Sequence, residues 1–142
     1  MSYTHRPVYD YRWFYPSDTI QMTTLETEKT STTSATPQLL LEVTLLNQIH
    51  PNSTFRIKFD MREKSTLLFC DAGIYINDTL VGTYFHYLGG WTQKSEDITY
   101  TGWRIGDRIQ IYGNGTPGTG GKAEVKALEI CGESNLWENT SP

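Results

Sequence analysis

The sequence predicts an all-β domain, organised as a two-sheet antiparallel β-sandwich of about seven or eight short strands. The composition favours strands, because aromatic residues make up 13% of the 142 residues and include nine Tyr and four Trp. Apolar and polar residues alternate in several segments, and turn-forming residues separate these segments roughly every eight to twelve positions. No long segment has the 3.6-residue period of an amphipathic helix, so no helix is expected.

The composition divides the chain into three parts. We expect residues 1–37 to form an N-terminal aromatic arm and a linker rich in Thr and Ser, residues 38–132 to form the β-sandwich, and residues 133–142 to form a polar tail. Within the first part, residues 19–28 are a weak strand candidate, and residues 29–37 have the composition of a loop.

The aromatic arm is the predicted interaction surface. A run of rings with irregular spacing cannot bury itself, and Tyr and Trp are enriched at protein interfaces. We therefore expect protein contacts through the rings of Tyr9, Tyr11, Trp13, Phe14 and Tyr15. On this hypothesis, residues 1–18 can be removed without unfolding the sandwich.

The first clear strands follow the linker. In residues 39–46 the apolar side chains occupy alternate positions with Glu42 and Thr44 between them, which indicates a strand. After a turn at residues 50–53, the segment FRIKFDMR (residues 55–62) alternates strictly, which is typical of a sheet with one face in water.

The remaining strands are predicted from turns and from shorter alternation. Asn77, Asp78 and Thr79 indicate a tight hairpin between two apolar segments, and residues 113–121 form a glycine-rich loop. In the last strand the apolar phase shifts near Leu128, which a β-bulge or burial on both faces would explain. The strands are expected at residues 72–76, 80–87, 91–100, 108–112 and 122–131.

The charge excludes one large class of partner. The formal net charge is −4 and the pI is about 5.3, and Lys and Arg are scattered singly. A protein that coats nucleic acid needs a basic face, so no nucleic-acid partner is expected. The first residues have no apolar core of a signal peptide, and the longest apolar stretch, residues 38–46, is too short to span a bilayer.

The sequence offers little support for catalysis. The three histidines, His5, His50 and His86, have no metal-ligand spacing, and no nucleophile motif or calcium loop is present. The loop GNGTPGTGG lacks the Lys and the following helix of a phosphate-binding loop. We therefore expect a protein that is not an enzyme and that has neither a metal nor a cofactor.

Cysteines and asparagines leave alternatives open. Cys70 and Cys131 are either two small buried side chains or a disulfide between a middle strand and the last strand. The N-x-S/T pattern marks four candidate glycosylation sites, although Asn is also common in turns. These sites are Asn52, Asn77, Asn114 and Asn139.

Four segments resemble single jelly-roll modules of virion components. The segments are FRIKFDM, GIYINDTLVGTYF, GWRIGDRIQIYGNG and KAEVKALEICG, and the resemblance covers residues 39–132, about two-thirds of the chain. It is a resemblance to decoration, turret, minor capsid and fibre-tip proteins, especially those of phages and of viruses of thermophilic archaea. It implies a jelly roll on the surface of a virion, or otherwise an extracellular protein, with the residues before the match latching onto neighbouring subunits.

Composition and resemblance together favour a non-enzymatic structural protein. We expect a capsid-associated subunit that contacts copies of itself or neighbouring capsid subunits and forms a homo-oligomer. One alternative is a carbohydrate-binding β-sandwich in which Tyr84, Trp91 and Trp103 stack on sugar rings. The other is a subunit of an extracellular filament that assembles by strand donation. The fold alone does not choose among these functions.

Overall fold

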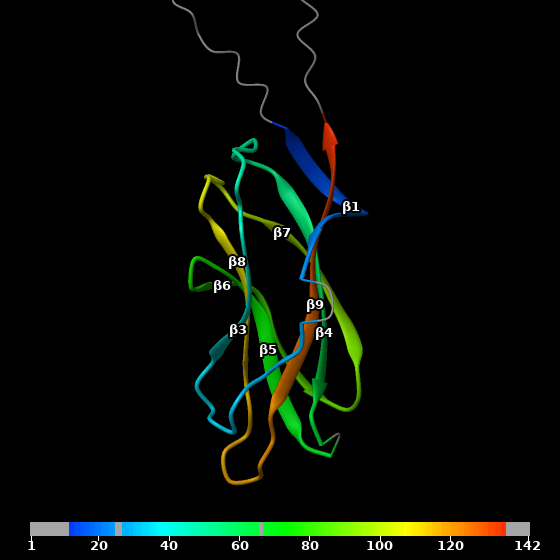
Figure 1. Ribbon diagram of the computed structural model, residues 1–142, viewed down its shortest axis with the longest axis vertical. Coiled ribbons are helices and arrows are strands. Elements are labelled where there is room, and N and C mark those ends of the chain that lie inside the picture. Colours follow the sequence, from blue (N-terminus) through cyan, green and yellow to red (C-terminus); the bar gives the residue numbers. More distant parts are fainter. Residues whose placement is uncertain (1–11, 25–26, 66, 136–142) are drawn as a thin grey trace, which may run out of the picture.

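The computed structural model describes residues 12–24, 27–65 and 67–135, and it is a two-layer, all-β structure (Figure 1). The five-stranded sheet has the order β1 (Trp13–Thr23), β9 (Ala123–Asn135), β4 (Thr54–Glu63) and β7 (Thr92–Thr99), and the short β2 (Lys29–Thr30) also pairs with β9. The four-stranded sheet has the order β3 (Gln38–Thr44), β8 (Arg108–Asn114), β5 (Phe69–Ile76) and β6 (Thr79–Leu88). All pairs are antiparallel, so the prediction of a two-sheet antiparallel β-sandwich is confirmed.

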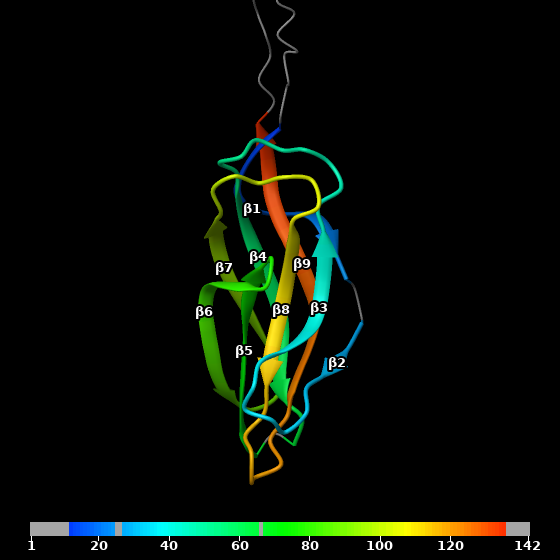
Figure 2. The ribbon, with the colours of Figure 1, turned by 90° about the vertical axis from the view of Figure 1, so that its left-hand side faces the viewer.

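The strand pairs are nested around one hairpin. β5 and β6 form the innermost pair, β4 pairs with β7, β3 pairs with β8, and β1 pairs with β9. Further pairing of β4 with β9 and of β5 with β8 joins these hairpins into the two sheets. Figure 2 looks onto the four-stranded sheet, with β6 and β3 as its edges.

The alternation predicted for residues 55–62 places one face of β4 in the core. Phe55, Ile57, Phe59 and Met61 are at most 3% exposed, whereas the side chains between them point away from the core. Each large apolar side chain buried in this way contributes roughly 1.5–3 kcal/mol to stability.

Two local features follow from single residues. Asn77 and Asp78 have φ angles of 50° and 67°, as a two-residue hairpin turn requires, and Asn and Asp tolerate this conformation better than most residues. In β9, Ala127 has a φ of 52° where the register with β4 shifts. This bulge explains the phase shift, because it lets both Val125 and Leu128 face the core with no exposed surface.

The predicted boundary between arm and sandwich is wrong. β1 begins at Trp13 and its first three residues pair with β9, and Phe14 is 7% exposed within the core. The pairing is interrupted after Tyr15, where Pro16 has no N–H to donate to a ladder. The linker also contributes β2, and β9 continues past residue 132 to Asn135. Removal of residues 1–18 would therefore cut into the sandwich.

Candidate functional site

A groove opens between the edge strands of the two sheets, β1 and β3. Its volume is about 540 Å³, which falls within the range of roughly 300–1,000 Å³ found for ligand pockets. Most of its lining is apolar and comes from both sheets and from the segment after β3. The apolar lining consists of Phe14, Met22, Val43, Leu45, Leu46, Ile49, Phe55, Ile109 and Ile130.

The rim of this groove carries apolar side chains in water. Leu46 is 73% exposed and Met22 is 38% exposed, and Ile20 on the same strand as Met22 is 53% exposed. Arg12, the first residue that the structure describes, also lines the groove, and its carbonyl accepts the backbone N–H of His50 at 2.8 Å. Residues 1–11 therefore join the domain at the groove itself.

On the opposite side of the sandwich, a side chain bridges the edge strands of the two sheets. There the Glu96 carboxylate on β7 accepts the backbone N–H of Thr83 on the edge strand β6, at 2.9 and 3.1 Å. Gly82 makes room for this contact, because a Cβ at that position would lie 2.9 Å from a carboxylate oxygen of Glu96. The side chain thus occupies one backbone donor on the free edge of β6. The groove beside β1 has no such cover among the described residues that line it.

The predicted interface residues have three different outcomes. Phe14 is a core residue that packs on Phe55 with ring centroids 5.0 Å apart, and it belongs to the wall of the groove rather than to an arm outside the sandwich. Trp13 stacks on His50 at 3.8 Å, and Tyr15 is 43% exposed. Tyr9 and Tyr11 lie outside the described residues.

A second candidate surface is the outer face of the four-stranded sheet, which we call the tyrosine face. Because Ile74, Ile76, Ile109 and Ile111 point into the core, the alternate residues of β5 and β8 point outward. The tyrosine face consists of Phe69, Asp71, Tyr75, Tyr84, His86, Tyr112 and Asn114, together with the residues around Asp78.

The rings of this face form two groups, and the rings within each group are in contact. Tyr75 stacks on Tyr112 with centroids 4.1 Å apart, and Tyr84 meets Tyr75 edge-on at 6.3 Å. Gly73 lies beneath Tyr84, where an added Cβ would come within 2.7 Å of the ring. Phe69 and His86 form a separate parallel stack with centroids 4.3 Å apart.

Polar side chains hold these rings in place. His86 Nδ1 lies 2.6 Å from one carboxylate oxygen of Asp71, and the Asn114 amide donates to the other at 3.1 Å. The Tyr84 hydroxyl donates to the Asn114 carbonyl oxygen. A continuous chain of contacts thus runs across β6, β8 and β5.

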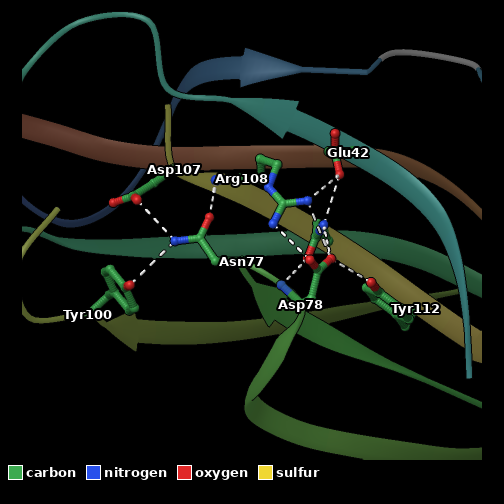
Figure 3. A network of polar contacts seen from close by, with 8 residues as sticks. Glu42, Asn77, Asp78, Tyr100, Asp107, Arg108 and Tyr112 are labelled. Atoms are coloured by element: carbon green, nitrogen blue, oxygen red, sulfur yellow. Dashed lines mark hydrogen bonds and ion pairs between the residues drawn. The ribbon is translucent and has the colours of Figure 1, made fainter. Parts of the chain in front are cut away.

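The second half of the network is centred on Asp78 (Figure 3). Its carboxylate accepts hydrogen bonds from the Tyr112 hydroxyl at 2.7 Å, the Gln110 amide at 2.8 Å and the Arg108 guanidinium at 2.8 Å. These bonds, that of Tyr112 first, lower the pKa of Asp78 to about 2. The same bond, followed by burial, raises the pKa of Tyr112 to about 12. Glu42 accepts a second bond from Gln110 and lies 3.9 Å from Arg108.

Charge is divided unevenly between the two outer faces. The strands of the four-stranded sheet contain no lysine, and Arg108 is their one arginine. The outer face of the five-stranded sheet carries ion pairs instead. These are Arg56 with Asp97 at 2.9 Å, Lys58 with Asp18 at 2.8 Å and Arg62 with Glu124 at 2.8 Å.

The three predicted sugar-stacking residues do not lie together. Only Tyr84 is on the tyrosine face. Trp91 lies on the charged side of the molecule, where the cations of Arg62 and Lys126 are 4.7 and 4.3 Å from the centre of its ring. Trp103 is 1% exposed and donates its indole N–H to the Ser53 carbonyl at 2.8 Å, so its assignment as a stacking platform is wrong.

Two of the candidate glycosylation sites are occupied by structural hydrogen bonds. The Asn77 amide donates to Asp107 and Tyr100, and its oxygen accepts the N–H of Arg108 (Figure 3). Asn114 is 4% exposed and uses both of its polar atoms within the sheet. A glycan on either nitrogen would displace these bonds, so neither site fits the folded domain.

The remaining predicted residues are simpler to place. Asn52 is exposed, which leaves its glycosylation a prediction, and Asn139 lies outside the described residues. Cys70 and Cys131 are both buried and free, so the disulfide alternative does not hold in this structure. Among the described residues, no group of three or more His, Cys, Asp or Glu side chains could hold a metal ion, and no helix could cross a membrane.

The comparisons with known proteins give no indication of function, so function is inferred from the two surfaces. No protein-family model matches the chain, and no curated protein matches it.

The sequence did not reveal the groove. Its exposed apolar residues lie on β1 and after β3, far apart in the chain, and only the fold brings them together. Tyr75 and Tyr112 were also missed, although their outward phase followed from the isoleucines beside them.

Proposed function

We propose that the protein is a non-enzymatic assembly subunit, and that the N-terminal segment of one copy docks in the groove of a neighbouring copy. The observation that carries the proposal is the open apolar groove at β1, which begins where residues 1–11 join the domain. Exposed apolar surface beside an edge strand favours association with an extended peptide. The segment supplies Tyr9 and Tyr11, and buried aromatic side chains dominate interface energies.

A second copy fits the groove better than the chain's own segment. To fold back into its own groove, the segment would need a tight turn just before Arg12, whose carbonyl is already bonded to His50. Turns use Gly, Pro, Asn, Asp and Ser, and residues 8–14 supply only Asp10. A segment that continues into a neighbour makes a heterologous contact, which closes into a ring or extends into a filament.

The strand order supports the finer classification of the domain as a jelly roll. The nested pairs follow from folding one long hairpin over into two layers, which is how eight strands make two Greek keys. Jelly rolls occur in viral capsids as well as in lectins, so a virion subunit is the setting that we propose, in keeping with the resemblance in residues 39–132.

The test compares the solution mass of four proteins by light scattering over a range of concentrations. These are the full chain, the chain without residues 1–11, Leu46→Lys in the groove, and Leu67→Lys as a control that is 78% exposed and does not line the groove. We expect the full chain and Leu67→Lys to form the same oligomer. Leu46→Lys should have the monomer mass of 16.2 kDa, and the truncated chain should have its own, smaller monomer mass.

A synthetic peptide of residues 1–12 separates docking from indirect effects. It should bind the truncated chain and bind much more weakly when that chain also carries Leu46→Lys. The proposal would be refuted if the full chain is a monomer and the truncated chain does not bind the peptide. It would also be refuted if the truncated chain still forms the oligomer.

A further inference from the structure

We propose that the tyrosine face binds a neutral oligosaccharide. Neither the proposed docking groove nor its residues take part, so this inference is independent of assembly. It rests on three properties of the face: paired exposed rings, planar polar groups beside them, and a charge that rejects polyanions.

The stack of Phe69 and His86 is the core of the proposed site. The Phe69 residue is 47% exposed and the His86 side chain is 62% exposed, so the stacked pair is accessible to a ligand. The positive edges of C–H groups are attracted to the negative face of an aromatic ring. A sugar presents such C–H groups on one side of its ring and hydroxyls around its rim.

Polar groups lie where the hydroxyls would be. Asp71 contacts His86 at 2.6 Å and is followed by Asn114 and Tyr84 in the chain of hydrogen bonds. Carboxylate oxygens have more than one lone pair each, so those of Asp71, whose side chain is 25% exposed, can accept a ligand hydroxyl in addition to their present bonds. Asn114 is 4% exposed, and its role is to hold Asp71 and Tyr84 in position. Because these side chains are already held in position, binding would order few of them, which lowers its entropic cost.

The size of the face fits an oligosaccharide rather than a single sugar. On β5 the residues from Phe69 to Tyr75, which pair with Leu88 and Leu80 of β6, span about 20 Å at 3.3 Å per residue. The second ring group, Tyr75 with Tyr112, lies along the same face beside Asp78 and Gln110. A chain of several sugar units could contact both groups.

The charge of the face argues for a neutral ligand. Arg108 is its one arginine, and it is paired with Asp78 at 2.8 Å and lies 3.9 Å from Glu42. Asp71 adds a further negative charge, and the four strands contain no lysine. Nucleic acids and sulfated or phosphorylated glycans require free cations, which the face does not offer.

The experiment screens the full-length protein against an array of neutral gluco-, galacto-, manno- and xylo-oligosaccharides and then measures affinity by isothermal titration calorimetry. Phe69→Ala and His86→Ala should each weaken binding roughly tenfold, as expected for the loss of an aromatic contact. Trp91→Ala, on the charged side of the molecule, is the matched control and should leave the affinity within about twofold.

Three outcomes would overturn the inference. One is no binding to any member of the array. Another is binding that Trp91→Ala abolishes and Phe69→Ala leaves unchanged, which would place the site on the other sheet. The third is a loss of solution mass on Phe69→Ala without sugar binding, which would assign the face to a protein partner.

Discussion

Phe14 shows where the core of the folded domain begins. The structure places this side chain in the core at 7% exposure, against Phe55 at 5.0 Å between ring centroids. Its backbone N–H also donates to the buried Ser53 hydroxyl at 3.0 Å. Phe14→Ala should therefore destabilise the whole domain, whereas loss of residues 1–11 should not.

The magnitude follows from the packing. Replacing a buried Phe by Ala costs about 3–5 kcal/mol, of which part is the cavity that remains. Phe14 also lines the open groove, so water can enter the space, and we expect about 3 kcal/mol. For a domain of this size that lowers Tm by about 10 °C. The hydrogen bond to Ser53 is kept, because it comes from the backbone.

Urea unfolding of three proteins checks this reasoning. The midpoint should fall for Phe14→Ala with an unchanged slope. At a protein concentration at which the full chain is monomeric, the chain without residues 1–11 should match the full chain within about 0.5 kcal/mol. A cost below about 1 kcal/mol for Phe14→Ala would refute the place of β1 in the core. Equal destabilisation by the truncation would show that residues 1–11 belong to the domain.

Three further predictions concern ionisable groups. Burial raises the pKa of Cys70 to about 12 and also raises that of Cys131, so a thiol reagent at about pH 8 should label neither in the folded protein and both in urea; rapid labelling without urea would contradict their burial. The pKa of Asp78 is lowered from 3.8 to about 2, so the stabilisation from its ionised form is complete above pH 3.8 and is lost as the pH falls toward 2. A nuclear magnetic resonance titration of the Tyr112 ring should therefore change in that window, and Asp78→Asn should abolish the change; an unchanged titration would separate Tyr112 from Asp78. Asp78→Asn should also lower the pKa of Tyr112 from its value of about 12, because the charged acceptor is gone.

The sequence was most informative where structure depends on near neighbours. The alternation in residues 55–62 was enough to orient β4, and the Asn77-Asp78 turn has the chemistry that a two-residue hairpin requires. The bulge at Ala127 left its trace as a shift in apolar phase. In each case the cause lies within a few residues of its effect.

Distant partners explain what the sequence could not predict. β1 does not alternate in an obvious way, and its position is set by pairing with residues of β9 more than 100 positions away. Trp103 follows a glycine in a turn, which suggests exposure, but the Ser53 carbonyl, 50 positions earlier, accepts its N–H and allows it to be buried. The groove and the tyrosine face likewise require the strand order, because each is assembled from several strands.

The two proposed surfaces can operate at the same time, because they lie on different parts of the sandwich. The groove opens at the side between β1 and β3, whereas the rings of the tyrosine face lie on the outer face of the four-stranded sheet. Copies joined through their grooves would leave each tyrosine face free. A long sugar chain bound weakly by one tyrosine face could then bind the tyrosine faces of several copies. Its residence time on the assembly would increase, although each copy makes the same contacts as before. The ion pairs on the opposite face suit it to remain in water, so on both proposals the uneven division of charge would leave one side of each copy to solvent and the other to a ligand.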